Sequence, residues 1–135
     1  MVNAEFSYEF SVGESHLDAF GHMNNATYFQ IFEEARWDIV TKRGYGLERI
    51  RETRMGPVIL EAKIKFLHEL VLGDRIKITS TCLPFDGKIA RIHQKMRGAN
   101  GVVAADVEFI YAIFDLSSRK IVPPTAEWLS AVGLA

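Results

Sequence analysis

The chain has 135 residues, a net charge of −1, 48% hydrophobic residues and 24% charged residues. This length suits one domain that buries a core of its own, and the composition is typical of a globular protein in water. The nearly neutral charge excludes a general attraction to nucleic acid or to an anionic membrane, so we expect neither as a partner. Because the sequence shows no signal peptide and no apolar run long enough to cross a bilayer, it predicts a cytoplasmic protein.

The first 12 residues predict a strand. Residues 5–12 alternate strictly, with apolar residues from Phe6 to Val12 at the even positions and Glu or Ser at the odd positions. This period of two is typical of a half-buried strand.

A long helix is predicted next, over about 17 residues that start near Asn25 and contain neither proline nor glycine. Asn24 or Asn25 can cap it, Lys42 and Arg43 complement its negative end, and Gly44 suits a left-handed exit. Its apolar positions form a stripe too broad for a helix that is buried on one side. These positions are Tyr28, Phe29, Ile31, Phe32, Ala35, Trp37, Ile39 and Val40. We therefore expect a sheet to curl around this helix.

The second half of the chain is predicted to consist of strands joined by short turns. The charged run 48–54 is interpreted as a solvated connection that ends at Gly56-Pro57. Asn100-Gly101 is a strong hairpin signal, and both faces of the strand after it are apolar, so we expect both to be covered. Pro123-Pro124 stops extended structure, and Thr125 can cap a short helix that runs to Ala131. The strands are expected at residues 58–66, 75–82, 88–97 and 102–114.

This order of elements predicts an α+β protein. Hairpin-length connections imply antiparallel pairing, and a helix that is apolar on several sides must be enclosed. We therefore expect a curved antiparallel sheet wrapped around one long central helix.

Cysteine and histidine indicate no metal site. Cys82 is the only cysteine in the sequence, which rules out an intrachain disulfide. His16, His68 and His93 lack the spacing of metal ligands. We therefore expect no metal and no cofactor, and interpret Cys82 as a small buried residue of a strand.

The segment LDAFGHMNNATYFQIFEEAR, residues 17–36, resembles the signature of the 4-hydroxybenzoyl-CoA thioesterase family, which are hot-dog-fold acyl-CoA thioesterases. The predicted order of elements is similar to that family over essentially the whole chain. One departure is His16, because many members carry an acidic residue two positions before the catalytic Asp. The residues that carry the resemblance are Asp18, Gly21, His22, Asn24, Asn25, Tyr28, Glu33 or Glu34, Ala35 and Arg36.

The resemblance implies an enzyme that hydrolyses the thioester of an acyl-CoA to a free acid and CoA. Asp18 would act as nucleophile or as the base that activates water, with Glu33 as a second candidate. Backbone amides of residues 24–26, at the positive end of the helix, would stabilise the oxyanion, and Gly21 would let the backbone approach the ligand. The simpler alternative for Asp18 is a loop residue that makes an Asx-turn.

The resemblance also implies substrate-binding residues. His22 is expected to orient a hydrogen bond, Asn24 to act as a cap, and Tyr28 to belong to the core with its hydroxyl hydrogen-bonded. Lys88 would hold CoA phosphates, whereas the basic positions of strand 88–97 are otherwise interpreted as a solvated face. Of Glu33 and Glu34, one would face the acyl pocket or the partner subunit and the other would pair with a cation on the helix surface.

We expect a homodimer that pairs again into a homotetramer, because strand 102–114 and the sheet edge are too apolar to stay exposed. Val58 and Ile59 of one subunit would then complete the site around Asp18 of the other. Three alternatives remain at this point: a non-catalytic acyl-CoA or acyl-carrier-protein binding module, a thioesterase acting on acyl-carrier protein, and a hot-dog dehydratase that uses His16 or His22. The presence of Asp18 with Gly21 favours the thioesterase.

Overall fold

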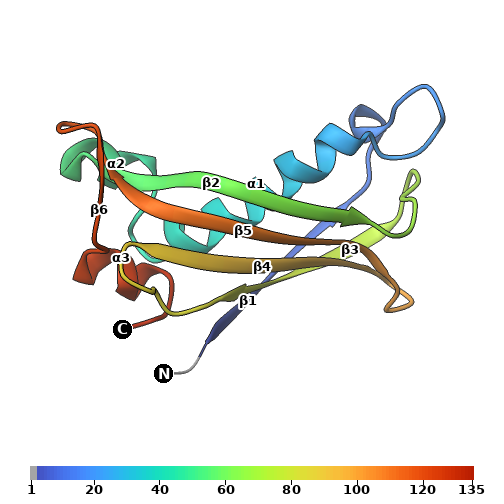
Figure 1. The fold of residues 1–135 in the computed structure, drawn as a ribbon. Helices are drawn as coiled ribbons and strands as arrows, with labels where there is room; N and C mark the ends of the chain where they lie inside the picture. Colours follow the sequence, from blue (N-terminus) through green and yellow to red (C-terminus); the bar gives the residue numbers. More distant parts are fainter. Residues whose placement is uncertain (1–2) are drawn as a thin grey trace.

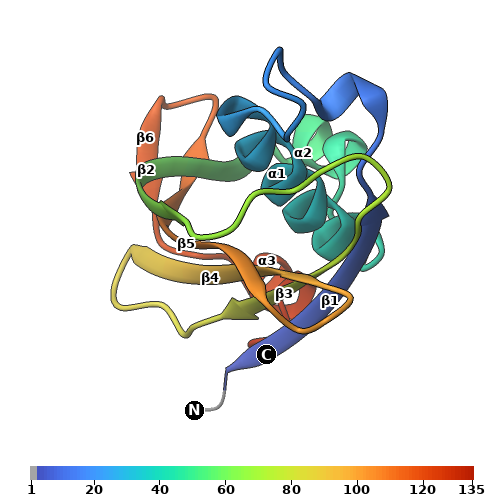
Figure 2. The same cartoon turned by 90° about the vertical axis from the view of Figure 1, so that its right-hand side faces the viewer.

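The structure, a computed structural model in which residues 3–135 are described, has a curved antiparallel sheet with one long helix on its concave side (Figures 1 and 2). The strands are β1 (Ala4–Ser11), β2 (Met55–Phe66), β3 (Arg75–Cys82), β4 (Ile89–Gly98), β5 (Val103–Asp115) and β6 (Lys120–Val122). The helices are the short 3-10 helix η1 (Glu14–His16), α1 (Asn25–Thr41), α2 (Leu47–Thr53) and α3 (Ala126–Ala131). Within residues 3–135 the strand order is β1-β3-β4-β5-β2, and β6 pairs with β5. The predicted α+β architecture, a curved sheet around one central helix, is confirmed.

Helix α1 begins and ends as predicted. The side chains of Asn24 and Asn25 both accept a hydrogen bond from the backbone N–H of Ala26, at 3.1 and 3.0 Å, which caps the first turn. At the other end Gly44 has a φ of 85°, the left-handed conformation that stops a helix. The residues that α1 buries are Thr27, Tyr28, Ile31, Phe32, Ala35, Ile39 and Val40. None of the helices within residues 3–135 is long and apolar enough to cross a membrane.

A buried polar group fixes α1 to the sheet. The side chain of Gln94, 0% exposed, donates hydrogen bonds to the Phe32 carbonyl and the Ser80 hydroxyl, at 3.1 and 3.0 Å. It accepts one from Nη1 of Arg36 at 3.1 Å, and the guanidinium lies 4.1 Å from the centre of the Phe109 ring. Burial lowers the pKa of Arg36 to about 10, so it stays charged at neutral pH. Each buried polar atom of this group therefore has a partner, and α1 has one position against β3 and β4.

Strands β1, β3 and β4 alternate as the sequence predicts. Every second residue of β3, from Ile76 to Cys82, and of β4, from Ala90 to Met96, is buried. The residues between them lie on the convex face, where Arg91 pairs with Glu108. The basic run of β4 is thus a largely solvated face.

Strand β2 departs from the predicted alternation. Its pairing with β5 shifts by one residue, because Ile59 opposes Tyr111 whereas Glu61 opposes Ile110. Leu60 is the extra residue of this β-bulge. The alternate positions Val58, Leu60, Ala62, Ile64 and Phe66 predict one shared face. This prediction is wrong for Val58, which opposes Ala112, whereas Ala62 and the alternate residues after it oppose Phe109 and the inner face of β5.

Strand β5, expected to be an exposed dimerisation surface, lies inside the sheet between β4 and β2. Its inner face is buried, as Ala105, Val107 and Phe109 show, whereas its convex face carries the exposed Glu108 and the half-buried Asp106. The prediction that both faces are covered is therefore wrong for the convex face, and a strand inside the sheet gives no reason for dimerisation. The free edges of the described sheet belong to β1 and β2.

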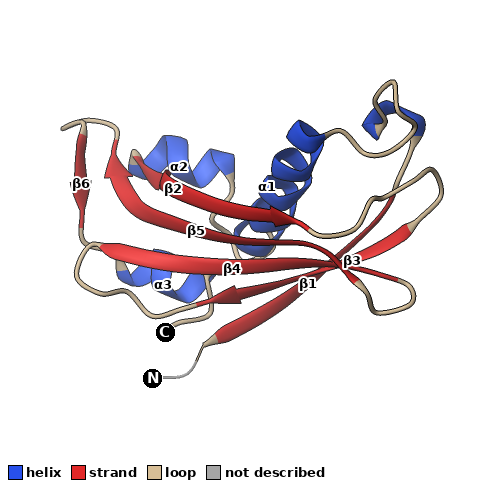
Figure 3. Cartoon of the chain, turned by 45° about the vertical axis from the view of Figure 1, so that its right-hand side comes forward, coloured by secondary structure: helices blue, strands red, loops and turns tan. Residues whose placement is uncertain are grey.

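The prediction that the charged run 48–54 is a solvated connection is wrong, because most of this run forms α2. Within it Ile50 is buried, and the left-handed Arg54, with a φ of 62°, ends it. Strand β6 was also not predicted. Figure 3 shows α2, α3 and β6 gathered at one end of the sheet, whereas the loop before α1 lies at the other end.

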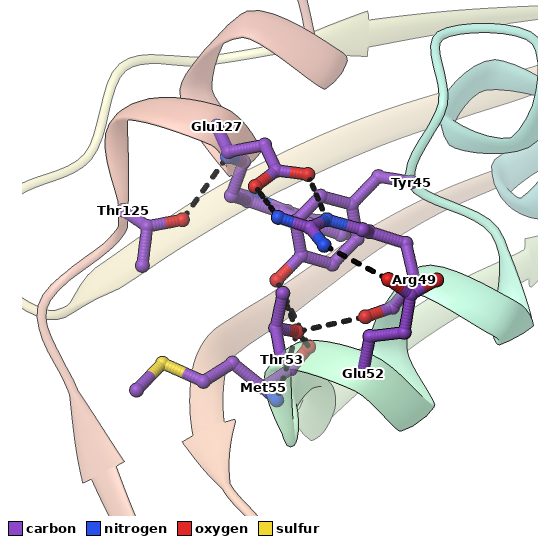
Figure 4. A network of polar contacts seen from close by, with 8 residues as sticks. Tyr45, Arg49, Glu52, Thr53, Met55, Thr125 and Glu127 are labelled. Atoms are coloured by element: carbon purple, nitrogen blue, oxygen red, sulfur yellow. Dashed lines mark hydrogen bonds and ion pairs between the residues drawn. The ribbon is translucent and has the colours of Figure 1, made fainter.

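Helix α3 forms as predicted, with Thr125 as its cap: the Thr125 hydroxyl accepts a hydrogen bond from the backbone N–H of Trp128 at 3.1 Å. After it, Gly133 packs so closely on β1 that a Cβ there would lie 2.8 Å from the Cβ of Ala4. Arg49 of α2 donates two hydrogen bonds to the Glu127 carboxylate, at 2.5 and 2.8 Å (Figure 4). This ion pair joins α3 to α2.

Candidate functional site

The loop between η1 and α1 folds around Asp18. The backbone N–H of Asp18 donates to the His22 carbonyl at 3.0 Å, and Gly21 N–H donates to the Asp18 carbonyl at 3.2 Å. One carboxylate oxygen, Oδ1, accepts from the N–H of Phe20 at 2.9 Å. This is the Asx-type contact of the simpler alternative for Asp18. The other oxygen, Oδ2, has no hydrogen-bond partner within residues 3–135, so the same contact holds the carboxylate in place and leaves one oxygen free.

Gly21 is required by the conformation of the turn. Its φ of +80° is strained for any residue with a side chain. A Cβ at Gly21 would meet no atom within 4 Å, and Gly21 does not line the cavity beside Asp18. The glycine therefore acts on the site by shaping the turn that positions Asp18.

An open cavity of about 640 Å³ lies beside this loop, at the N-terminal end of α1. We call it the Asp18 cavity. It brings together loop residues, the first turns of α1 and the end of β2. Its lining residues are Asp18, Phe20, His22, Met23, Asn25, Tyr28, Phe66, Leu67, His68 and Glu69.

Most of the first backbone N–H groups of α1 already donate hydrogen bonds within the protein. Asn24 N–H donates to the His16 carbonyl at 3.0 Å, and Ala26 N–H is taken by the two Asn side chains. Among the described residues, Asn25 N–H has no acceptor, and Asn25 lines the Asp18 cavity. Of the three amides expected to stabilise an oxyanion, Asn25 therefore has the N–H that is available.

His22 is held by its backbone and by ring stacking. It forms an isolated β-bridge with Val71, and its ring stacks on Phe20 with centres 5.9 Å apart and planes at 15°. Phe20 itself is 84% exposed. The loop thus presents a pair of flat rings at the rim of the Asp18 cavity.

Tyr28 is a core residue, as expected, but its hydroxyl has no hydrogen-bond partner within residues 3–135. The ring packs edge-on against Phe66 with centres 5.0 Å apart. Burial raises the pKa of Tyr28, and the nearby Glu69 carboxylate raises it further. The hydroxyl is therefore a neutral group, and Tyr28 lines the Asp18 cavity.

A second, narrower cavity of about 100 Å³ lies further along α1, between α1, β2 and α3. We call it the α1–α3 cavity. Its walls are mostly apolar, with Glu33 and Arg36 as the charged residues. The lining residues are Glu33, Arg36, Trp37, Ile39, Val40, Pro57, Ile59, Cys82, Ile92, Tyr111, Trp128 and Val132.

The predicted site residues are thus divided. Asp18, His22, Asn25 and Tyr28 meet at the Asp18 cavity, whereas Glu33 and Ile59 line the other one. Glu33 follows Asn25 by eight residues, a rise of about 12 Å along the helix axis. Asn24 serves as the cap, and Val58 lines neither cavity.

Lys88 lies far from Asp18 within one chain. It precedes Ile89, which opposes Ala112 of β5, whereas Phe66 at the Asp18 cavity opposes Ala105. Seven residues along β5 correspond to about 23 Å. One chain therefore does not bring Lys88 to the Asp18 cavity.

Several lining residues were not expected from the sequence. Leu67, His68 and Glu69 follow a predicted strand end, which gave no indication of a site. Trp128 of α3 and Tyr111 of β5 come together with α1 only through folding. The one available signal was the charge of Arg36 in an apolar helix.

The Asp18 cavity has the parts that acyl transfer requires. A carboxylate oxygen is free to attack or to take a proton, and a free N–H at a helix N-terminus can stabilise a negatively charged oxygen. A carbonyl placed between them would be polarised by the helix and attacked from the Asp18 side.

Comparison with known proteins shows the family of the chain. The sequence profile of the Thioesterase-like superfamily matches residues 12–132. The long-chain acyl-CoA thioesterase FadM of Escherichia coli (strain K12) is 30% identical over 106 residues, which cover 78% of this chain and 80% of FadM.

Solved structures share the fold over nearly the whole chain. SAV2348 from Staphylococcus aureus, in complex with CoA, has a TM-score of 0.88 at 20% identity, with 98% of this chain and 84% of that chain covered. Slr0204, a 1,4-dihydroxy-2-naphthoyl-CoA thioesterase from Synechocystis, has a TM-score of 0.87 at 20% identity, with 96% of both chains covered. The chain therefore belongs to the Thioesterase-like superfamily and has its hot-dog fold.

Proposed function

We propose that this protein is an acyl-CoA thioesterase in which Asp18 is the catalytic carboxylate, with the whole chain acting as one hot-dog domain. The observation that carries the proposal is the shared cavity of two unpaired groups, Oδ2 of Asp18 and the N–H of Asn25. Membership of the superfamily, the name of the E. coli relative and the CoA complex of a similar fold support a CoA thioester as substrate.

In the reaction, the carbonyl oxygen of the thioester accepts a hydrogen bond from Asn25 N–H. As general base, Asp18 takes a proton from water while the water oxygen bonds to the carbonyl carbon. The C–S bond then breaks, and Asp18 gives that proton to the leaving sulfur, so that CoA departs as the thiol and Asp18 is again a carboxylate. As nucleophile, Asp18 instead bonds to the carbon and displaces CoA, and water hydrolyses the resulting anhydride. One well-placed oxyanion donor contributes roughly 10²- to 10³-fold to such a step.

The other residues of the Asp18 cavity position these groups. Gly21 shapes the turn, Asn24 caps the helix, and His22 and Tyr28 form the walls that face the substrate. Glu33 remains a second carboxylate candidate, but its position in the α1–α3 cavity suits contact with the acyl group better than proton transfer at Asp18.

We propose a homodimer formed by the free edge of β2, with two dimers forming a tetramer. The support is the unpaired edge of β2 and its exposed apolar residues, Ile59, Leu60 and Phe66, at 41, 45 and 49% exposure. Lys88 and Val58, which one chain leaves away from its own Asp18 cavity, would then act in the cavity of the other subunit.

Within the superfamily we place the chain in the 4-hydroxybenzoyl-CoA thioesterase branch, on the residues of its 17–36 segment. We propose CoA rather than acyl-carrier protein as the carrier, and the cytoplasm as its location, since CoA thioesters are made and used there. The named relatives act on long-chain and on aromatic acyl groups, so both classes belong in a first substrate panel.

The decisive experiment replaces Asp18 by Asn, which keeps the turn contact of Oδ1 but removes the negative charge. We expect at least ~10²-fold loss of kcat in a thiol-release assay with acyl-CoA. Asp74→Asn is the matched control, because Asp74 also accepts a backbone N–H in a turn, from Val71 at 3.0 Å, but does not line the Asp18 cavity. This control should retain wild-type turnover.

A well-folded Asp18→Asn protein with near wild-type turnover would exclude Asp18 and leave Glu33 as the carboxylate to test. Rapid-quench mass spectrometry of the wild type separates the two roles of Asp18. An acyl adduct on Asp18 indicates a nucleophile, and its absence during turnover indicates a general base.

The second candidate function is a module that binds acyl-CoA without hydrolysing it. The free Phe20–His22 stack and the open Asp18 cavity would suit binding alone. Tight binding of acyl-CoA without any release of thiol would support this module and contradict the enzyme.

A further inference from the structure

We propose that the α1–α3 cavity receives the far end of the acyl chain and that Trp128 closes this cavity, so that Trp128 sets the longest chain the enzyme accepts. This inference rests on the proposed thioesterase function, and it adds a specificity residue that lies in the last helix of the chain, far from Asp18 in sequence.

Both cavities lie on the same side of α1. Asn25 lines the Asp18 cavity, and Glu33 and Trp37, eight and twelve residues later, line the α1–α3 cavity. Residues four apart share one face of a helix. Between them lies Phe29, which is 38% exposed and packs edge-on against Phe109. This stretch of α1 leads from the Asp18 cavity to the α1–α3 cavity.

Strand β2 lies opposite α1 along the proposed path of the acyl chain. Its end at Phe66 lines the Asp18 cavity and contacts Tyr28, while Ile59 and Pro57, earlier in the strand, line the α1–α3 cavity. An acyl chain whose carbonyl lies at Asn25 can therefore run between α1 and β2. It must cover about 12 Å, the rise from Asn25 to Glu33, before its end enters the second cavity.

The lining of the α1–α3 cavity suits a hydrocarbon end. Its deep residues include Ile92, Cys82 and Val132, each 5% exposed or less. Every methylene that leaves water for such a wall gains roughly fourfold in binding. The volume of about 100 Å³ takes only the last few carbons of a chain, at ~30 Å³ for a group of water size.

The side chain of Trp128 is held in place by packing and by a hydrogen bond. It is 3% exposed, and its ring packs edge-on against Tyr45 and Tyr111 with centres 5.3 and 6.1 Å apart. Its indole N–H donates to the Tyr111 hydroxyl at 3.3 Å. The helix that carries it is capped by Thr125 and joined to α2 by the ion pair of Glu127 (Figure 4). A side chain held in this way cannot move aside for a longer chain.

The test measures kcat/KM for acyl-CoAs from butanoyl to octadecanoyl. For the wild type we expect kcat/KM to rise with length and to fall once the chain meets Trp128. Trp128→Leu should move the fall to chains at least two carbons longer. Phe85→Leu is the matched control, because Phe85 also packs edge-on against Tyr111, at 5.6 Å, but does not line the cavity. It should leave the position of the fall unchanged.

Two further variants keep the test decisive if Trp128→Leu does not fold. Val132→Ala enlarges the same end of the cavity and should also favour longer chains, whereas Cys82→Met fills it and should favour shorter ones. Opposite shifts of the two profiles support the inference. Identical profiles for wild type and both folded variants would overturn it.

A binding experiment tests the position without catalysis. In Trp37→Phe protein, Trp128 is the remaining tryptophan, since the sequence has two. Free fatty acids with a terminal bromine should quench its fluorescence from the chain length at which the bromine reaches the indole. Hydrolysis by the wild type without such quenching at any length would overturn the inference and leave the thioesterase standing. Absence of hydrolysis of every acyl-CoA would overturn the proposed function instead.

Discussion

Lys88 is an exposed cation in the tight turn that joins Asp86 to Ile89. Within residues 3–135 no carboxylate lies within 4 Å of its ammonium group. A free ammonium at a rigid turn can reach a phosphate, which an otherwise neutral protein must bind through local charges. The pantetheine arm of CoA is nearly uncharged, whereas its nucleotide carries several phosphate charges.

We expect Lys88→Ala to raise KM for acyl-CoA several-fold with little change in kcat, because a contact made equally in ground and transition states is lost. Hydrolysis of an acyl-pantetheine thioester, which has no phosphate, should be almost unaffected. The effect on acyl-CoA should shrink with added salt, since the contact is exposed. Lys77→Ala, on the convex face of β3, serves as the control. Equal KM changes for both substrates would show that Lys88 acts through structure.

The predictability of the site differed from residue to residue. Asp18, Asn25 and Tyr28 were found through a local segment, because neighbours in sequence make up that part of the Asp18 cavity. Trp128 could not be found, because its partners Tyr45 and Tyr111 lie 83 and 17 residues away in sequence and meet it only in the folded sheet. A sequence motif can predict a site whose residues are neighbours in sequence. The residues that line the α1–α3 cavity come from distant parts of the chain, so no motif predicts it.

Among the elements, α1, β1, β3 and β4 were predictable because each has one buried face with a regular period. Helix α2 was not, since Ile50 is its one buried residue and seven residues with so many charges resemble a loop. The bulge of β2 was hidden because Ile59 and Leu60 are both apolar. An apolar pair gives no sign of which residue faces inward.

The ion pair between α2 and α3 leads to a pH prediction. Arg49 lowers the pKa of Glu127 below the value it has in the unfolded chain, chiefly through the hydrogen bonds between them. The ion pair therefore stabilises the fold at pH values above the ordinary Glu pKa of about 4.3, and this contribution is lost as pH falls through the lowered pKa.

Glu127→Gln should accordingly lower Tm at neutral pH, while wild type and variant should converge in acid. The difference should be small and should decrease with salt, because both side chains are largely in solvent. Glu5→Gln, on the exposed face of β1, is the control. Thermal unfolding followed by circular dichroism at a series of pH values measures this, and a Tm difference that is the same at every pH would contradict it.

At the scale of the whole molecule, the convex face of the sheet is covered by charges of both signs. Arg91 lies 3.6 Å from Glu108, and His93 lies 2.5 Å from Asp106, on neighbouring strands. Such a face stays in water. The edge strand β2 instead exposes three apolar residues, Ile59, Leu60 and Phe66, which makes this edge the better surface for a second subunit.

We expect the protein in solution to have a mass that is a multiple of the 15.3 kDa of one chain. Leu60→Lys should shift it toward the monomer and reduce turnover, because a charge on the edge of β2 opposes strand pairing and each site needs both subunits. Leu47→Lys, at a leucine of α2 that is 56% exposed, should change neither. Light scattering checks this, and a wild-type mass near 15.3 kDa with full activity would contradict the dimer.

The bulge at Leu60 also governs which insertions and deletions this chain can accept. On one side of it the strand presents Ile59 to the interior, and on the other side Ala62, so the two halves are out of step by one residue. Removal of Leu60 would restore an unbroken alternation and leave both halves paired with β5 as they are, because the extra residue opposes no residue of β5. A residue removed elsewhere in β2 would instead turn part of the strand over and exchange its inner and outer side chains, so Leu60 is the position of this strand at which a deletion is best accepted.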